Sequence, residues 1–241
     1  MNVVFRSCLF AAFQILITPP FAVVALLTFP LAPLTRYRII TTWSRLILLA
    51  TRHICGIRYR VIGADHIPRE PCVVLSKHQS AWETIAFQVI FPPQAYVIKR
   101  ELLWIPFFGW GLAMISPIAI NRSAGTRAAR QMLELGKNRL AQGFWVIVYP
   151  EGTRVAPGTR GTYQSGGAAI ARHAGARVLP VAHNAGKCWR RNAFLKYPGL
   201  ITVSIGEPID AGALKAEALT RRIEEWIETE MTRLDGHDDP T

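Results

Sequence analysis

The chain has 241 residues, half of them apolar, which is enough for one large domain with a single core. Lysine and arginine number 28 against 16 acidic residues, and the net charge of +12 favours an anionic partner: a membrane surface, a phosphorylated substrate or nucleic acid. Nucleic acid is the weakest of these because the chain has no recognisable nucleic-acid-binding motif. The four cysteines lie far apart, which argues against a zinc site or a disulfide framework and favours a reducing compartment.

The N-terminal segment is strongly apolar, since no residue between Arg6 and Arg36 is charged. It is long enough to span the roughly 30 Å apolar core of a bilayer. However, Pro19 and Pro20 fall near its middle, where proline interrupts a helix. We therefore expect a membrane-embedded hairpin of two short helices that meet at these prolines, dip into one leaflet and return, with both ends cytoplasmic. A cleaved signal peptide is the alternative, although no small-x-small cleavage site precedes a polar start.

An amphipathic helix is predicted next, within residues 36–61. Apolar residues recur there at helical spacing, with arginines between them: Ile39, Ile40, Trp43, Leu46, Ile47 and Ala50. Such a helix either lies on an anionic membrane surface or packs on the core with its arginines in water, and the pattern suits both. We expect membrane-anchoring helices in residues 1–58 and an α/β domain in residues 59–241.

From Tyr59 onward, short β-rich runs alternate with helical stretches. Strands are predicted at residues 58–63, 71–76, 94–99, 144–150, 177–182 and 199–206. Helices are predicted at roughly residues 81–90, 126–141, 166–173 and 214–234. This alternation indicates an α/β fold in which helices flank a central, largely buried sheet.

The stretch LSKHQSAWET, residues 75–84, holds His78 and Glu83 where a strand gives way to a helix. One interpretation is a capping box, in which Ser80 and Glu83 satisfy the open backbone donors of the helix start. The other makes His78 a general base and Glu83 the carboxylate that orients it. The second interpretation requires His78 to precede the helix and to fold back toward Glu83.

Three further blocks follow predicted strands, where such folds expose their functional loops. They are IKRELLWIPFFGWG at 98–111, YPEGTR at 149–154 and VLPVAHNAG at 178–186. With the His78 block, and in this order, they resemble the 1-acyl-glycerol-3-phosphate acyltransferase family over about residues 59–208. YPEGTR is the most specific block, close to the family's F-P-E-G-T-R-S. The chain departs from the family pattern at three positions, with Tyr149 for Phe, Val155 for Ser and Glu83 for Asp.

The resemblance implies an α/β fold with a mixed, largely parallel sheet and assigns roles to the residues of these blocks. His78 takes the proton of the attacking hydroxyl, and Glu83 fixes the imidazole tautomer and stabilises the imidazolium that forms. A phosphate on the acceptor suits guanidinium and ammonium groups, in the order Arg154, Lys99 and Arg122. The remaining residues of the acceptor site are Glu151, Gly152 and Thr153, and Gly152 supplies a backbone conformation closed to larger residues. His183 is expected to be a hydrogen-bonded residue at a strand end.

The implied reaction is transfer of a fatty acyl group from acyl-CoA or acyl carrier protein to the 2-hydroxyl of 1-acyl-glycerol-3-phosphate (lysophosphatidate), giving phosphatidate. No metal or other cofactor is implied. The partners are the acyl donor, the lysophosphatidate acceptor and the bilayer, with no nucleic acid. We expect the protein at the inner (cytoplasmic) membrane, with the active domain on the cytoplasmic side.

Two other functions are compatible with the motifs. One is acyl transfer to another lyso-lipid, such as lyso-ornithine lipid. The other is a non-catalytic lipid-binding protein, against which the intact His78 and YPEGTR blocks argue. The aromatic segment at 102–115 either packs in the core or lines a channel for acyl chains, and the sequence favours neither.

Overall fold

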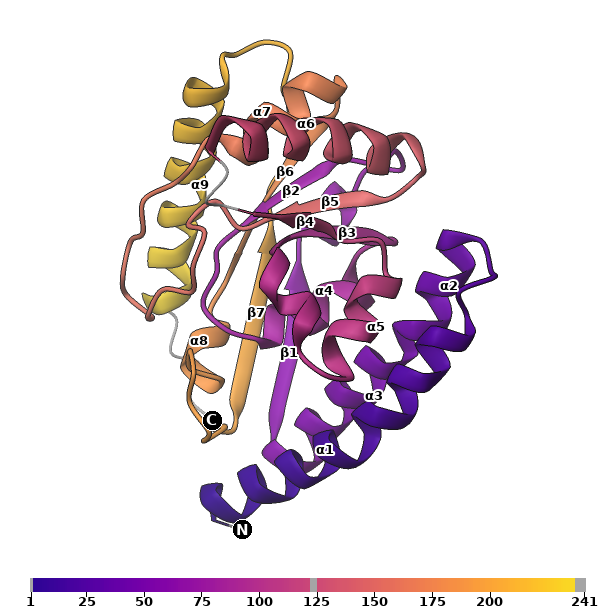
Figure 1. The fold of residues 1–241 in the computed structure, drawn as a ribbon. Coiled ribbons are helices and arrows are strands. Elements are labelled where there is room, and N and C mark those ends of the chain that lie inside the picture. The colour runs from indigo at the N-terminus through magenta and orange to yellow at the C-terminus, as the bar shows by residue number, and fades with distance from the viewer. Residues whose placement is uncertain (1, 122–124, 237–241) are drawn as a thin grey trace.

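The computed structural model describes residues 2–121 and 125–236 (Figure 1). In this part of the chain one sheet contains β1 Ile57–Ile62, β2 Val73–Ser76, β3 Gln94–Lys99, β4 Ile118–Ile120, β5 Trp145–Val148, β6 Arg177–His183, β7 Gly199–Ile205 and β8 Ile209–Asp210. The α-helices are α1 Val3–Leu27, α2 Pro33–Ile40, α3 Thr42–Ala50, α4 Trp82–Ile90, α5 Phe108–Met114, α6 Gly125–Ala141, α7 Gly166–Ala174, α8 Ala185–Cys188 and α9 Ala216–Gly236. Shorter helical segments are η1 Thr51–Cys55, η2 Ala64–His66 and η3 Arg100–Trp104.

The sheet is mixed and largely parallel, as predicted. Its strand order is β1-β7-β6-β2-β5-β3-β4, and β8 pairs with β6. The β6–β7 and β6–β8 pairs are antiparallel, and the other pairs are parallel. This confirms the predicted α/β fold class. It also brings the carboxyl ends of β6, β2, β5 and β3, which are neighbours in the sheet, to one edge.

Helices cover both faces of the sheet, and the side chains of β2 alternate between them. Val73 and Leu75 pack into one apolar cluster with residues of α6, α7 and α9, whereas Val74 packs into a second cluster with residues of α1, α3 and α4. Figure 1 shows these two groups of helices on opposite sides of the strands. Because every residue of β2 is buried, its sequence reads as a continuous apolar run and not as an alternating one.

The predicted break of the N-terminal segment at Pro19 and Pro20 is wrong, because α1 runs through both prolines as one helix. Each proline lacks the N–H that would reach the carbonyl four residues earlier. The helix nevertheless continues, and Thr18 Oγ1 donates to Gln14 O (2.7 Å) just before the prolines. The chain bends after Leu27 instead, and Pro33 opens α2, where the missing N–H has no helical partner to lose.

The N-terminal helices still form a hairpin, with its bend between α1 and α2. The segments α3 and η1 return along α1. A Cβ placed on Gly56, at the start of β1, would lie 3.1 Å from Arg6 Nη1, near the start of α1. Within the described residues, α1 is long and apolar enough to cross a membrane. Many of its large apolar side chains are exposed, among them Ile15 and Leu16.

The strands and helices predicted after residue 57 are present, with ends that shift by one or two residues. The shortest elements were not predicted. For example, β4 has three residues and α8 has four, which is too short for a periodic pattern to be visible. The division of the chain near residue 58 stays a prediction.

Gly175 and Gly63 both have positive φ, but a Cβ would meet a close neighbour only at Gly63. Comparing alanine substitutions at the two positions therefore separates the loss of stability caused by backbone conformation from the loss caused by a clash. Gly175 has φ +64° with open space around its Cα, whereas Gly63 has φ +74° and a Cβ there would lie 2.2 Å from Ile205 O. We expect Gly175→Ala to lower the free energy of unfolding by about 1 kcal/mol, and Gly63→Ala by at least about 2 kcal/mol. Thermal unfolding in detergent measures both, and equal losses would contradict the predicted clash.

Candidate active site

His78 and Glu83 meet, although five positions separate them. His78 lies in the turn between β2 and α4, and its Nδ1 is 2.8 Å from Glu83 Oε1. The Glu83 side chain is fully buried, while the His78 side chain is 14% exposed. His78 therefore precedes the helix and folds back toward Glu83, as the base interpretation requires. Since Nδ1–H donates to the carboxylate, Nε2 carries the lone pair of the neutral ring.

Glu83 also binds backbone N–H groups of the turn before α4, although the N-cap residue itself is Ala81. The same Oε1 accepts hydrogen bonds from Gln79 N (3.0 Å) and Ser80 N (2.8 Å), and Ser80 Oγ accepts one from Trp82 N (3.0 Å). Burial raises the pKa of Glu83, but the nearby imidazoles of His183 and His78 and the hydrogen bonds it receives outweigh burial and hold this pKa below its usual value. Both interpretations of the His78 block thus describe one ionised carboxylate.

His183 occupies the end of β6, behind this pair. Its Nε2 lies 2.9 Å from Lys77 O, and its Nδ1 accepts from Ala185 N at 3.3 Å. Burial lowers the pKa of His183. Both contacts suit a neutral ring protonated on Nε2, which agrees with the prediction of a hydrogen-bonded residue at a strand end.

The YPEGTR block packs directly against His78. Glu151 Oε2 accepts a hydrogen bond from His78 N (2.9 Å), and Val155 N donates to His78 O (2.8 Å). The Tyr149 ring stacks on the imidazole, with ring centroids 3.9 Å apart. Gly152 has φ +65°, so the backbone conformation expected there is present. These contacts fix the main chain and one face of the imidazole.

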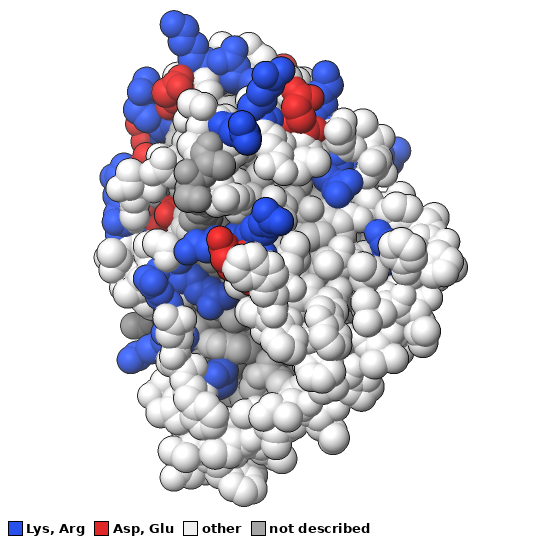
Figure 2. Space-filling model, in the orientation of Figure 1, with Lys and Arg blue, Asp and Glu red and all other residues white. Residues whose placement is uncertain are grey.

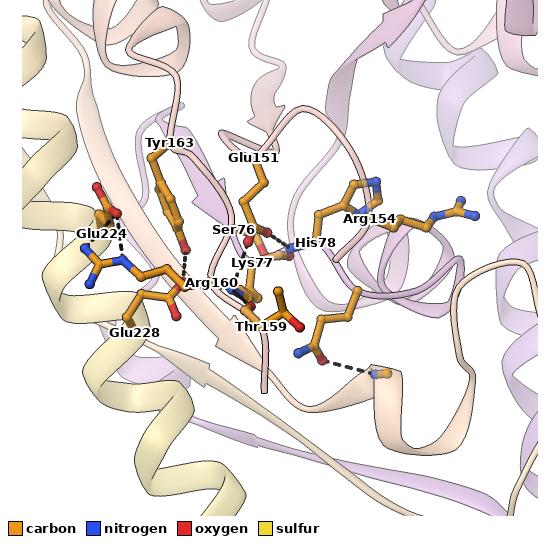
Figure 3. A network of polar contacts seen from close by, with 12 residues as sticks. Ser76, Lys77, His78, Glu151, Arg154, Thr159, Arg160, Tyr163, Glu224 and Glu228 are labelled. Carbon is orange, nitrogen blue, oxygen red and sulfur yellow. Dashed lines mark hydrogen bonds and ion pairs between the residues drawn. The ribbon is translucent and has the colours of Figure 1, made fainter. Parts of the chain in front are cut away.

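A polar network that was not predicted lies on the other side of the YPEGTR block (Figure 3). Lys77 is buried and its ammonium contacts Glu151 and Glu228, the latter from α9. In Figure 3 the Lys77 and Glu228 side chains point toward each other across the loop that carries Thr159. Lys77 could have been found from the sequence, because it directly follows a predicted buried strand. No signal pointed to Glu228, which is 151 positions away.

A cavity of about 870 Å³ opens beside His78. Its lining includes Lys99, Glu151, Gly152, Thr153 and Arg154, all of which were predicted as site residues. Arg122 lies outside the described residues. Arg191, which was not predicted, joins this group, and its Nη1 donates to Arg154 O at 2.6 Å. In Figure 2, basic side chains gather next to a broad surface without Lys, Arg, Asp or Glu.

Most of the cavity wall is apolar. Leu102, Phe107 and Phe108 from the aromatic segment line it, which favours the channel interpretation of that segment over the core interpretation. The cavity continues to Phe21 and Ala22 of α1. Its size and lining suit a long apolar ligand with one polar end.

The comparisons with known proteins agree with this geometry. Residues 58–184 match the family model described as Acyltransferase. A 1-acyl-sn-glycerol-3-phosphate acyltransferase of Pseudomonas aeruginosa is 43% identical over 92% of this chain and 90% of its own length. The chain belongs to the 1-acyl-sn-glycerol-3-phosphate acyltransferase family. This confirms both the family and the enzyme class that the motifs indicated.

A more distant relative gives the same family with less coverage, and a solved structure shows the fold. The alpha 1-acyl-sn-glycerol-3-phosphate acyltransferase of Mus musculus is 34% identical over 57% of this chain, which spans 49% of that relative. The crystal structure of the 1-acyl-sn-glycerophosphate acyltransferase PlsC from Thermotoga maritima aligns with a TM-score of 0.80, covering 99% of this chain and 97% of that one at 21% identity. The second comparison shows that this acyltransferase shares the fold of PlsC.

Proposed function

We propose that this acyltransferase moves a fatty acyl group from acyl-CoA or acyl carrier protein to the 2-hydroxyl of 1-acyl-glycerol-3-phosphate, forming phosphatidate. The observation that carries the proposal is the His78–Glu83 pair at an apolar cavity whose polar wall holds Lys99 and Arg154. The name of the 43% identical relative supports lysophosphatidate as the acceptor.

The chemistry follows from the protonation of the pair. Nε2 of His78 accepts the proton of the 2-hydroxyl as its oxygen attacks the thioester carbonyl, and Glu83 stabilises the imidazolium. The tetrahedral intermediate then collapses, the carbon–sulfur bond breaks, and the imidazolium returns the proton to the departing thiolate. The products are phosphatidate and the free thiol of the donor, so atoms and charge balance without a covalent enzyme intermediate.

The acceptor phosphate is assigned to Arg154 and Lys99. Arg154 is half-buried beside the cavity and offers paired donors that suit a phosphate dianion, whereas Lys99 is exposed at the end of β3. Glu151 serves the acceptor site indirectly, because its carboxylate oxygens already contact Lys77 and His78 N. Gly152 and Thr153 form the turn that carries Arg154.

We also propose attachment to one leaflet of the inner membrane, with the active domain on the cytoplasmic side. The α/β part holds α1 near both ends: Ser7 Oγ accepts from Lys196 N (2.9 Å), and Ala25 is buried in the core. A helix fixed in this way lies along the domain, which supports attachment to one leaflet. Exposed aromatics of the neighbouring segment, such as Trp104 and Trp110, suit the membrane interface.

The direct test of the function is an acyl-transfer assay with the purified full-length protein in detergent. Lysophosphatidate and lyso-ornithine lipid are offered as acceptors, each with acyl-CoA and with acyl carrier protein as donor. We expect phosphatidate and free thiol in equal amounts. Strong turnover on lyso-ornithine lipid with none on lysophosphatidate would overturn the proposed acceptor.

Substitutions in the His78 block distinguish its catalytic role from its role in holding the backbone at the start of α4. We expect His78→Ala to lower kcat about 100- to 10,000-fold, the usual contribution of a general base. Glu83→Gln keeps an acceptor for Gln79 N and Ser80 N but removes the charge, so most of the rate should be lost while the fold remains. Ser80→Ala is the control, and it should cost about 1 kcal/mol of stability with little effect on rate. Wild-type kcat in either His78→Ala or Glu83→Gln would contradict the mechanism.

Loss of the Arg154 guanidinium should weaken the binding of lysophosphatidate and not that of the acyl donor. A charged hydrogen bond contributes about 1.5 to 3 kcal/mol, so Arg154→Ala should raise KM for lysophosphatidate roughly ten- to a hundredfold at about 1.4 kcal/mol per decade. Arg154→Lys should recover only part, because an ammonium cannot supply paired donors. Steady-state kinetics with each substrate varied in turn provides the measurement. An equal rise in KM for the acyl donor would instead indicate that Arg154 shapes the loop.

The membrane arrangement predicts the sidedness of α1. In a protein with Cys8→Ser, single cysteines at Asn2→Cys and Thr35→Cys should react with a membrane-impermeant label from the same side of sealed vesicles. Replacing Ile15 and Leu16 with asparagine should weaken sedimentation with anionic vesicles, since both side chains are exposed on α1. Ile62→Asn, at an exposed position on β1, is the matched control. Labels on opposite sides would mean that α1 spans the membrane.

A further inference from the structure

Among the described residues, the most completely buried cation near the site is one that the proposed mechanism leaves unused. Lys77 is 1% exposed, and its Nζ lies 2.8 Å from Glu151 Oε1, 2.8 Å from Glu228 Oε1 and 3.0 Å from Thr159 O. Burial of an ammonium group is unfavourable unless charged and polar partners surround it. Here two carboxylates and a carbonyl fill that role.

The contacts of Lys77 form a continuous path from the C-terminal helix to His78. Glu228 on α9 contacts Lys77, Lys77 contacts Glu151 Oε1, and Glu151 Oε2 accepts the hydrogen bond of His78 N. Tyr163 Oη donates to Glu228 Oε1 (2.7 Å), which holds the Glu228 carboxylate from the other side. Figure 3 shows these side chains converging between α9 and the turn that carries His78.

The charge on Lys77 determines whether Glu151 can hold His78. Burial raises the pKa of Glu151, and the Lys77 ammonium opposes this effect. Without the ammonium, Glu151 and Glu228 would be two neighbouring carboxylates with no cation between them, so Glu151 would take up a proton or move. Either change weakens the hydrogen bond that anchors the His78 main chain.

We propose that Lys77 and Glu228 are positioning residues, which set the place of the imidazole through Glu151 and so tie catalysis to the C-terminal helix. The proposal rests on His78 being the base. Glu228 lies beyond residues 58–184, the segment that matches the family model. Neither Lys77 nor Glu228 lines the substrate cavity. Their loss should therefore act on kcat and leave KM for both substrates close to the wild-type value.

The test compares Lys77→Met, Glu228→Gln and the double variant in the full-length protein. A small displacement of a catalytic group can cost up to about a hundredfold in rate, so we expect Lys77→Met to lower kcat ten- to a hundredfold with each KM within twofold. Glu228→Gln keeps the hydrogen-bonding shape and removes only charge, so a smaller fall is expected. The double variant should be less impaired than the product of the two single effects, because both substitutions break one path.

The matched control is Glu224→Gln, one turn earlier on α9. Glu224 pairs with Arg160 at 2.7 Å, between the same loop and the same helix, but Arg160 is 61% exposed and the pair does not contact Lys77. Its loss should leave kcat unchanged. A kcat within twofold of wild type in folded Lys77→Met and Glu228→Gln proteins would overturn the proposal. So would an equal fall in Glu224→Gln, which would mean that α9 contributes only stability.

A spectroscopic measurement covers two further cases, that Lys77→Met fails to fold and that the wild type shows no turnover. The chain has six histidines, so selective ¹⁵N-histidine labelling gives a simple amide spectrum in detergent, and His78→Ala identifies the His78 signal. We expect Glu228→Gln to move this amide signal and Glu224→Gln to leave it in place. An unmoved signal in Glu228→Gln would overturn the positioning path. Absence of acyl transfer by the wild type would overturn the proposed function alone.

Discussion

One oxygen atom, Glu83 Oε1, determines how the site is built. It receives the imidazole Nδ1–H of His78 and the backbone N–H groups of Gln79 and Ser80, inside a fully buried environment. A buried carboxylate is stable only when such donors surround it. Because these donors belong both to the start of α4 and to the imidazole, the beginning of the helix and the direction of the ring cannot change independently.

His78 is thus held by two carboxylates that come from different strand ends. Glu83, after β2, holds the ring, while Glu151, after β5, holds the backbone N–H. The sheet makes this possible because β2 and β5 are parallel neighbours whose loops leave the same edge. The two carboxylates that contact His78 also differ in how they are held. Glu83 accepts hydrogen bonds from nearby backbone N–H groups, whereas Glu151 pairs with a lysine that contacts the distant α9.

The sequence predicted those parts of the molecule whose signals are local. The strands, the His78–Glu83 pair and the YPEGTR loop could be found because short spacing and chain order reveal them. The predicted break of the N-terminal helix at Pro19 and Pro20 was wrong. It rested on the local effect of proline on a helix and gave too little weight to the unbroken apolar run around the two prolines. Glu228 could not be found at all, since a glutamate on an amphipathic, charged helix looks like any solvent-facing residue until the fold places it beside Lys77.

The helix α1 contributes Phe21 and Ala22 to the cavity wall, so the helix that we propose as the membrane attachment also lines the cavity. In the proposed arrangement, membrane attachment and the wall of the acyl-chain cavity therefore depend on different side chains of one helix. An N-terminal helix exchanged between relatives would carry chain-length preference with it, and a detergent that coats α1 would compete with substrate from outside the α/β part. If α1 contacts the bilayer as proposed, the chain-length selectivity of this enzyme would be a joint property of the protein and of the lipid around α1.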